Sequence, residues 1–142
     1  MNIHKITENY FVSAQIETAD ADALVDAGIV RVICNRPDQE VPVALQADAI
    51  GTAVRAASID FAVLPIIHQS MTQSVVAQQS ELINSADGPV LAYCASGTRS
   101  TVIWALGQIG TLRVDEILNQ TAQAGYDLSG RRPTLQGLST ND

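Results

Sequence analysis

Three short apolar runs, separated by longer runs with helical spacing, constrain the fold of this chain more than any other feature. The runs at 29–34, 61–67 and 90–93 are typical of buried strands. Helices are predicted between them at 44–57 and 72–86, where apolar residues recur at helical spacing. Strands that alternate with helices of about 10–15 residues predict βαβ units around a parallel sheet with right-handed crossovers.

Further runs complete the predicted domain, and the chain of 142 residues is expected to form one domain over residues 1–142. The other predicted elements are a strand or hairpin over 3–16, a helix from Thr18 to Gly28, a helix that ends near Ile109, and a last helix from Asp115 to Gly125. The polar tail, residues 129–142, is expected to be only loosely ordered.

The composition narrows the classes of function. A formal net charge of −7 argues against non-specific binding to nucleic acid and against attraction to an anionic membrane surface. The chain has only two cysteines, so a fold held together by disulfide bonds is not expected and a reducing compartment is favoured. No signal-like apolar segment opens the chain, and no apolar run approaches the roughly 18 residues of a membrane span. A cytoplasmic protein with no nucleic-acid or membrane partner is expected.

Reactive and polar residues follow each of the three apolar runs, at 34–36, 67–69 and 94–99. Because the carboxyl ends of parallel strands meet at one edge of a sheet, these residues are expected to form one site. The two histidines lie far apart in the sequence, with no carboxylate cluster near them. No metal and no cofactor are therefore expected at this site.

Cys94 begins a loop of small residues between the third apolar run and a predicted helix. Unpaired N–H groups and a partial positive charge at a helix N-terminus favour a thiolate and bind anions, and a planar arginine side chain holds an oxyanion with two hydrogen bonds. We therefore expect Cys94 and Arg99 to be catalytic. The expected anion-binding residues are Ala95, Ser96, Gly97, Thr98 and Ser100. The alternative is a buried cysteine followed by an ordinary arginine.

Three segments, 32–38, 60–61 and 92–100, carry a resemblance that extends over nearly the whole chain. The chain resembles the phosphatase-like domains of beta-lactamase hydrolase-like proteins, a bacterial family also known as DUF442. The resemblance implies a three-layer α/β fold of the dual-specificity phosphatase type, with four parallel strands, with or without a fifth antiparallel strand, flanked by helices. It also implies Cys94 as the nucleophile, Arg99 as the anion ligand, and a sulfur-oxidising enzyme as a partner.

The sequence departs from the phosphatase pattern at three places. Four residues separate Cys94 from Arg99, where phosphatases of this superfamily have five. Tyr93 precedes the cysteine where those enzymes usually have histidine. They also use an aspartic acid as proton donor on a loop before the cysteine, and this chain has no aspartate between residues 61 and 86.

The four-residue spacing is instead similar to that of rhodanese-type sulfurtransferases. A phosphoester must expel an alkoxide or phenoxide, for which a proton donor is worth about 10²–10⁴-fold in rate. Sulfite leaves thiosulfate without a proton. The leading hypothesis is therefore a sulfurtransferase that acts on thiosulfate or a persulfide through a Cys94 persulfide. The alternatives are a phosphatase that hydrolyses a small anionic phosphoester through a phosphocysteine, and a non-catalytic anion-binding or redox-sensing module.

Three residues at the same predicted edge have auxiliary interpretations. Arg36 either extends the anion site or forms an ion pair at the surface. His68 lies nearest to the expected position of a proton donor, but a plain loop histidine is the simpler interpretation. Cys34 is either a small buried residue or, as in some phosphatases of the resembling superfamily, the partner of the nucleophile in a reversible disulfide.

Overall fold

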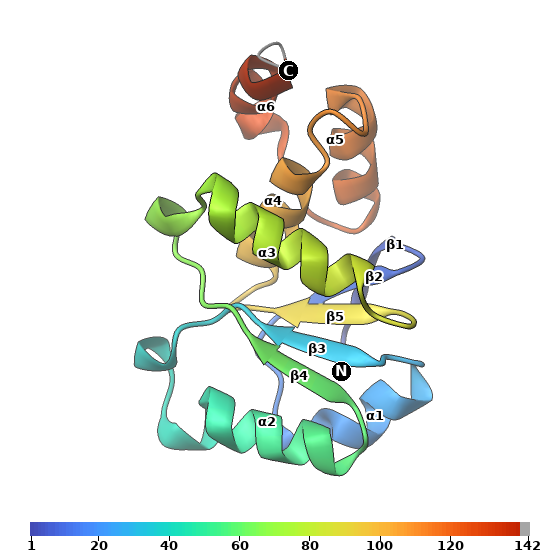
Figure 1. Cartoon of the computed structure of the whole chain (residues 1–142), viewed down its shortest axis with the longest axis vertical. Coiled ribbons are helices and arrows are strands. Elements are labelled where there is room, and N and C mark those ends of the chain that lie inside the picture. The colour runs from blue at the N-terminus through green and yellow to red at the C-terminus, as the bar shows by residue number, and fades with distance from the viewer. Residues whose placement is uncertain (140–142) are drawn as a thin grey trace.

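The computed structural model describes residues 1–139 and is built around a five-stranded sheet (Figure 1). The strand order is β1-β2-β5-β3-β4, with β1 antiparallel to β2 and the remaining neighbours parallel. The strands are β1 (His4–Thr7), β2 (Tyr10–Ser13), β3 (Arg31–Cys34), β4 (Asp60–Val63) and β5 (Val90–Tyr93). The predicted α/β class with four parallel strands and one antiparallel strand is confirmed.

Strand β5 occupies the centre of the sheet, where Val90 pairs with Tyr10 of β2 on one side and with Arg31 of β3 on the other. All four residues of β5 are buried, because helices cover both faces of a parallel sheet. Cys94 follows directly at the carboxyl end of this strand. The sheet therefore places the reactive loop at the middle of its edge, beside the ends of β2 and β3.

The helices are α1 (Ala21–Asp26), α2 (Ala47–Ala56), α3 (Gln73–Asn84), α4 (Thr98–Gly107), α5 (Val114–Gln123) and α6 (Arg132–Ser139). Helices α1 and α2 cover one face of the sheet and α3 and α4 cover the other (Figure 1). Helices α5 and α6 lie beyond α4, at the end of the molecule farthest from α2 (Figure 1). No helix of the described part of the chain has the length and apolar character needed to cross a membrane.

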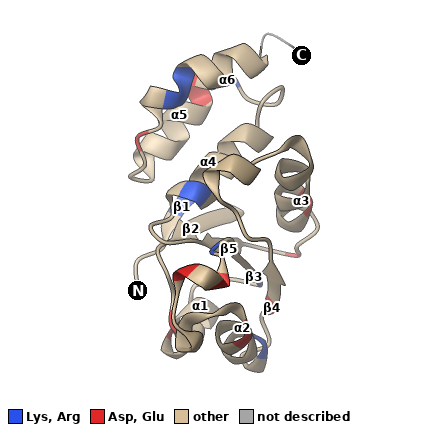
Figure 2. Ribbon diagram, turned by 90° about the vertical axis from the view of Figure 1, so that its left-hand side faces the viewer, with Lys and Arg blue, Asp and Glu red and all other residues tan. Residues whose placement is uncertain are grey.

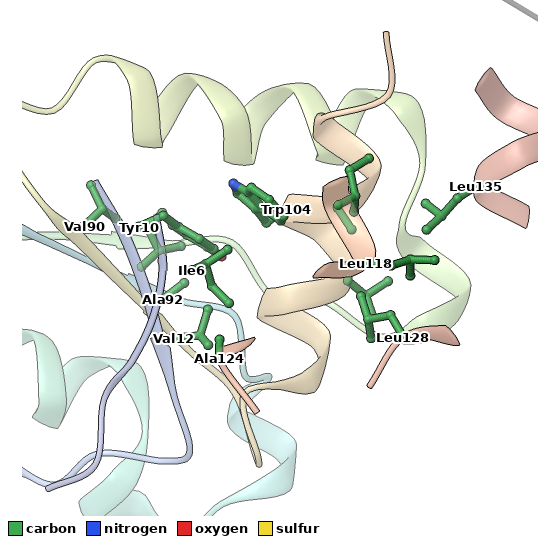
Figure 3. Packing of buried hydrophobic residues seen from close by; sticks show 14 residues of the cluster. Ile6, Tyr10, Val12, Val90, Ala92, Trp104, Leu118, Ala124, Leu128 and Leu135 are labelled. Carbon is green, nitrogen blue, oxygen red and sulfur yellow. The ribbon is translucent and has the colours of Figure 1, made fainter. Parts of the chain in front are cut away.

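Each face of the sheet has its own apolar core. On the α3–α4 face, Tyr10 stacks on Trp104 with ring centroids 6.5 Å apart (Figure 3). Leu128 and Leu135 extend this cluster towards α5 and α6. The other core contains Cys34 and includes residues of α1 and α2.

Two predicted boundaries and one predicted state are corrected. Strand β4 ends at Val63 rather than residue 67, although the Leu64 and Ile66 amides still donate to Cys34 and Asn35 across the gap. The helix predicted from residue 44 begins at Ala47, after a short 3₁₀ turn. The tail expected to be loose forms a 3₁₀ turn and α6 up to residue 139, because Leu135 is buried. Residues 140–142 lie outside the described chain.

Candidate active site

Cys94 lies at the bottom of a tight loop that leads from β5 into α4. Its side chain is buried, with a residue exposure of 1%. The Gly97 N–H donates to the Cys94 Sγ at 3.1 Å. Helix α4 begins at the next residue, Thr98. The structure therefore brings the predicted nucleophile and an N-terminal amide of the helix into direct contact, as a stabilised thiolate requires.

Gly97 is required by its backbone conformation and by its surroundings. Its φ of +94° lies in the left-handed region, which costs a residue with a side chain free energy. A Cβ added here would overlap the hydroxyl oxygen of Tyr126 and lie 2.9 Å from its Cζ. The loop can therefore close on Cys94 only with glycine at this position.

The outer part of the loop is polar and open to solvent. Ala95 and Ser96 are exposed, and the Ser96 hydroxyl donates to the Thr98 hydroxyl at 3.0 Å. The Thr98 amide donates to the Ser96 hydroxyl at 3.4 Å, a long hydrogen bond that an incoming anion can replace. The predicted anion-binding role of Ala95, Ser96 and Thr98 is consistent with this position and remains a prediction.

Arg99 is held by a carboxylate that the sequence patterns did not single out. Its two terminal nitrogens donate to the two oxygens of Glu40 at 2.8 and 2.7 Å, and Nη1 also donates to the Ile66 carbonyl at 2.8 Å. The hydrogen bonds from Arg99 are the main reason that the pKa of Glu40 is lowered, and Glu40 in turn raises the pKa of Arg99. The charge of Cys94 makes a smaller contribution that also raises the pKa of Arg99.

Arg36, two residues after the end of β3, binds the same carboxylate. Its Nε donates to Glu40 at 3.2 Å, and its Nη1 donates to the Gln15 side chain at 3.3 Å. Two arginines therefore bind one carboxylate, and Figure 2 shows how few basic residues the ribbon carries elsewhere. The ion-pair interpretation of Arg36 describes its contacts here, and direct anion binding by Arg36 remains a prediction.

A closed ring of buried hydrogen bonds lies beneath the loop. Ser100 donates to Asn35 at 2.8 Å, and Asn35 and Gln79 exchange two amide hydrogen bonds of 3.0 and 3.1 Å. Gln79 donates to the Tyr10 hydroxyl at 3.2 Å, which donates to the Ser100 carbonyl at 2.7 Å. Because the Ser100 hydroxyl is engaged inside the protein, any contribution of Ser100 to anion binding would come from its amide.

Tyr126 contacts the loop from the segment between α5 and α6. Its hydroxyl donates to the Ser96 carbonyl at 3.0 Å, and its ring meets the edge of His4 with centroids 5.4 Å apart. Burial and the charge of Cys94 raise the pKa of Tyr126. Sequence patterns gave no signal for this residue, which lies just beyond the predicted end of the last helix.

Among the described residues, neither Cys34 nor His68 forms a hydrogen bond with the loop from 94 to 100, although Cys34 pairs in the sheet with Tyr93, directly before the loop. Cys34 packs in the core on the α1–α2 face and donates to the Arg36 carbonyl at 3.4 Å, and burial raises the pKa of its thiol. Both cysteines are free, so the disulfide with Cys94 remains a prediction. His68 is exposed and lines a cavity of about 260 Å³ with Met71 and Leu135, and a role as proton donor also remains a prediction.

The fold and the loop together define a class of protein. The central parallel strand β5 ends at Tyr93, directly before the buried Cys94. Helix α4 begins four residues after Cys94, at Thr98, and carries Arg99 in its first turn. This arrangement is that of domains with the phosphatase fold. The family profile "Beta-lactamase hydrolase-like protein, phosphatase-like domain" matches residues 2–111, and the chain belongs to this family.

Two similar proteins match almost the whole chain. The beta-lactamase hydrolase-like protein of Xylella fastidiosa strain Temecula1 is 32% identical over 136 residues, which are 94% of this chain and 31% of that protein. The chain therefore spans about a third of the length of the curated relatives it matches. The crystal structure of the nma1982 protein from Neisseria meningitidis Z2491 is 32% identical and covers 97% of this chain and 99% of that chain, with a TM-score of 0.88.

A more distant structure shows the same fold. TpbA of P. aeruginosa, in complex with pTyr, has a TM-score of 0.69 at 16% identity and covers 99% of this chain and 89% of that chain. This likeness confirms the expected phosphatase-type architecture. The family supports an enzyme of the phosphatase type and gives no support to the leading hypothesis of sulfur transfer.

Proposed function

We propose that this domain is a cysteine-based phosphatase that hydrolyses a small phosphomonoester. The observation that carries the proposal is the contact between the Gly97 N–H and the Cys94 Sγ in a loop that also presents Arg99. The thiolate would attack phosphorus, forming an S–P bond as the P–O bond to the leaving group breaks. Water would then cleave the S–P bond, releasing phosphate and restoring the thiolate.

The carboxylate nearest to the reaction is suited to orientation rather than to proton donation. Glu40 has a lowered pKa because Arg99 and Arg36 donate to it, so it is ionised near neutral pH. Among the described residues, no other carboxylate forms a hydrogen bond with the residues of the loop from 94 to 100. We therefore expect the best substrates to be aryl phosphates, because a phenoxide of an acidic phenol leaves without a proton.

Sulfur transfer is a second candidate, favoured by the four residues between Cys94 and Arg99 and by the ionised state of Glu40. In that reaction the thiolate would attack the outer sulfur of thiosulfate, forming an S–S bond as the original S–S bond breaks and sulfite departs. The persulfide would pass its outer sulfur to an acceptor thiol or to cyanide. Neither step needs a carboxylic acid as proton donor.

One pair of assays on the same preparation separates the two functions. Release of p-nitrophenol from p-nitrophenyl phosphate measures phosphatase activity, and thiocyanate formed from thiosulfate and cyanide measures sulfur transfer. The proposal expects phosphate release with a trapped phosphocysteine on Cys94 and little thiocyanate. Thiocyanate formation without phosphate release would favour the second candidate, and inactivity in both assays would favour an anion-binding module.

Replacing Glu40 with glutamine is expected to raise the KM for p-nitrophenyl phosphate by roughly 5–50-fold, because Arg99 loses charge-assisted hydrogen bonds that orient it. Steady-state kinetics measures the effect. Glu81→Gln, at an exposed position on α3, is the control and should leave KM unchanged. Equal KM values for Glu40→Gln and the wild type would show that Arg99 is oriented without the carboxylate.

The same pair has a consequence for stability at low pH. Because the folded-state pKa of Glu40 lies below its ordinary value of 4.5, its contribution is present above that pH. The contribution is lost as the pH falls through the lowered folded-state value. Urea unfolding should therefore separate the wild type from Glu40→Gln at pH 6, and the difference should shrink steadily below pH 4.5. A difference that is constant with pH would contradict this expectation.

A further inference from the structure

The C=O and the N–H of the peptide that joins Ser96 to Gly97 each form a hydrogen bond, on opposite sides of the loop. The Ser96 carbonyl accepts a hydrogen bond from the Tyr126 hydroxyl at 3.0 Å. The Gly97 N–H of the same peptide donates to the Cys94 Sγ at 3.1 Å. The hydroxyl and the thiol are therefore connected through a single rigid group.

A trans peptide is planar, and its C=O and N–H point in opposite directions. The described chain contains no cis peptide bond, so holding the Ser96 carbonyl outward necessarily holds the Gly97 N–H inward. Gly97 can adopt many backbone conformations, because it lacks a Cβ. Its own conformation therefore cannot keep this peptide from rotating, and a rotated peptide would turn a carbonyl oxygen towards the sulfur and destabilise a thiolate.

Tyr126 is itself fixed before it reaches the loop. Its amide donates to the Thr121 carbonyl at 2.9 Å at the end of α5. Gly125, with a φ of +102°, reverses the chain ahead of it, and the His4 ring packs against the tyrosine ring from β1. The residue lies outside the segment 2–111 that matches the family profile. The family match therefore does not account for this contact.

We propose that Tyr126 is a positioning residue that keeps the Ser96–Gly97 peptide oriented with its N–H on the Cys94 sulfur. The hydroxyl polarises the carbonyl, which strengthens the hydrogen bond that the opposite end of the peptide donates. No proton is transferred along this chain of groups. The Gly97 N–H contacts the Cys94 sulfur in the free protein, before any substrate binds, so this positioning role applies to phosphorus and sulfur chemistry alike.

The test is the pH dependence of Cys94 alkylation by iodoacetamide, followed by intact mass spectrometry. A Cys34→Ser background leaves one thiol, so every adduct reports on Cys94. Tyr126→Phe removes the hydroxyl and keeps the ring. The midpoint of the alkylation profile should move up by about 0.5–1 pH units, and the rate below the midpoint should fall about 3–10-fold.

Gln123→Ala is the matched control, because Gln123 is exposed at the end of the same helix, α5. It should give the wild-type profile. An unchanged midpoint in a folded Tyr126→Phe protein would overturn the proposal. Because alkylation needs no substrate, this result is separate from success or failure in the phosphatase assay.

A second measurement uses the protein without a tyrosine substitution, in case Tyr126→Phe does not fold. In ¹⁵N-labelled protein, the Gly97 amide proton should shift with the same midpoint as Cys94 alkylation, because its acceptor changes from thiol to thiolate. A Gly97 amide that does not respond through that pH range would equally overturn the proposal.

Discussion

Cys94→Ser is expected to lower turnover of p-nitrophenyl phosphate by roughly 10³-fold or more, because a serine hydroxyl is not ionised near neutral pH and is a poor nucleophile without a base. The structure offers no histidine to activate it, since His68 lines a different cavity and His4 packs on Tyr126. Initial rates at saturating substrate, together with a circular dichroism spectrum, measure the effect in folded protein.

Cys34→Ser is the matched control, since it removes the other thiol from the core on the opposite face of the sheet. We expect it to keep turnover within about twofold of the wild type, because serine is close to cysteine in size and the Cys34 thiol donates to the Arg36 carbonyl rather than to the loop. If Cys94→Ser retained a tenth of wild-type turnover, covalent catalysis through Cys94 would be wrong.

Gly97→Ala is expected to cause the second large effect, a loss of stability of about 2–4 kcal/mol together with loss of turnover. About 1–2 kcal/mol comes from the left-handed backbone at φ +94°, and the remainder from displacement of the Tyr126 ring by the new Cβ. Urea unfolding followed by fluorescence gives the change in free energy. The loss of turnover follows because the displaced loop no longer holds the Gly97 N–H on the sulfur.

Gly28 provides the control that separates the two causes. It has a φ of +80°, and nothing lies within 4 Å of an added Cβ. Gly28→Ala therefore reports the backbone cost alone, about 1–2 kcal/mol. Gly97→Ala should exceed it, and the excess should disappear when Gly97→Ala is combined with Tyr126→Ala. Equal losses of stability for Gly28→Ala and Gly97→Ala would show that the contact of the new Cβ with Tyr126 adds no cost.

The fold and the reactive loop could be predicted because both depend on local patterns. Alternating apolar runs specify buried strands and amphipathic helices, and a small-residue loop after a buried strand locates Cys94. Because the carboxyl ends of parallel strands meet at one edge of a sheet, the position of Arg36 near the loop could also be predicted. The short helix α6 was missed, because a single buried leucine, Leu135, in a polar segment gives no recognisable period.

The partners of the loop could not be predicted from the sequence. Glu40 lies 59 positions from Arg99, and Tyr126 lies 30 positions from Ser96. Each is a single polar side chain in an irregular segment, so neither contributes to a periodic pattern, and their contacts depend on how distant loops meet in three dimensions. Of the two, Glu40 could more easily have been found, since it lies in the same segment after β3 as Arg36.

The residue spacing in the loop does not by itself identify its chemistry. The four residues between Cys94 and Arg99 led to sulfur transfer as the first hypothesis, whereas the family to which the chain belongs is phosphatase-like. Because one fold can support more than one reaction, the likeness to the family favours the phosphatase over the sulfurtransferase, and the assays are still needed to decide between them. The ionised Glu40 is the feature of this site that most restricts which leaving groups are suitable.

The ring formed by Tyr10, Asn35, Gln79 and Ser100 has an evolutionary consequence. Each member is at most 1% exposed and uses its polar atoms within the ring or on neighbouring backbone. Changing one member alone would leave a buried donor or acceptor without a partner, at a cost of about 1–3 kcal/mol. These four positions should therefore vary together among related sequences, so that the residue at position 79 on α3 is correlated with the residue at position 100, beside Arg99 on α4.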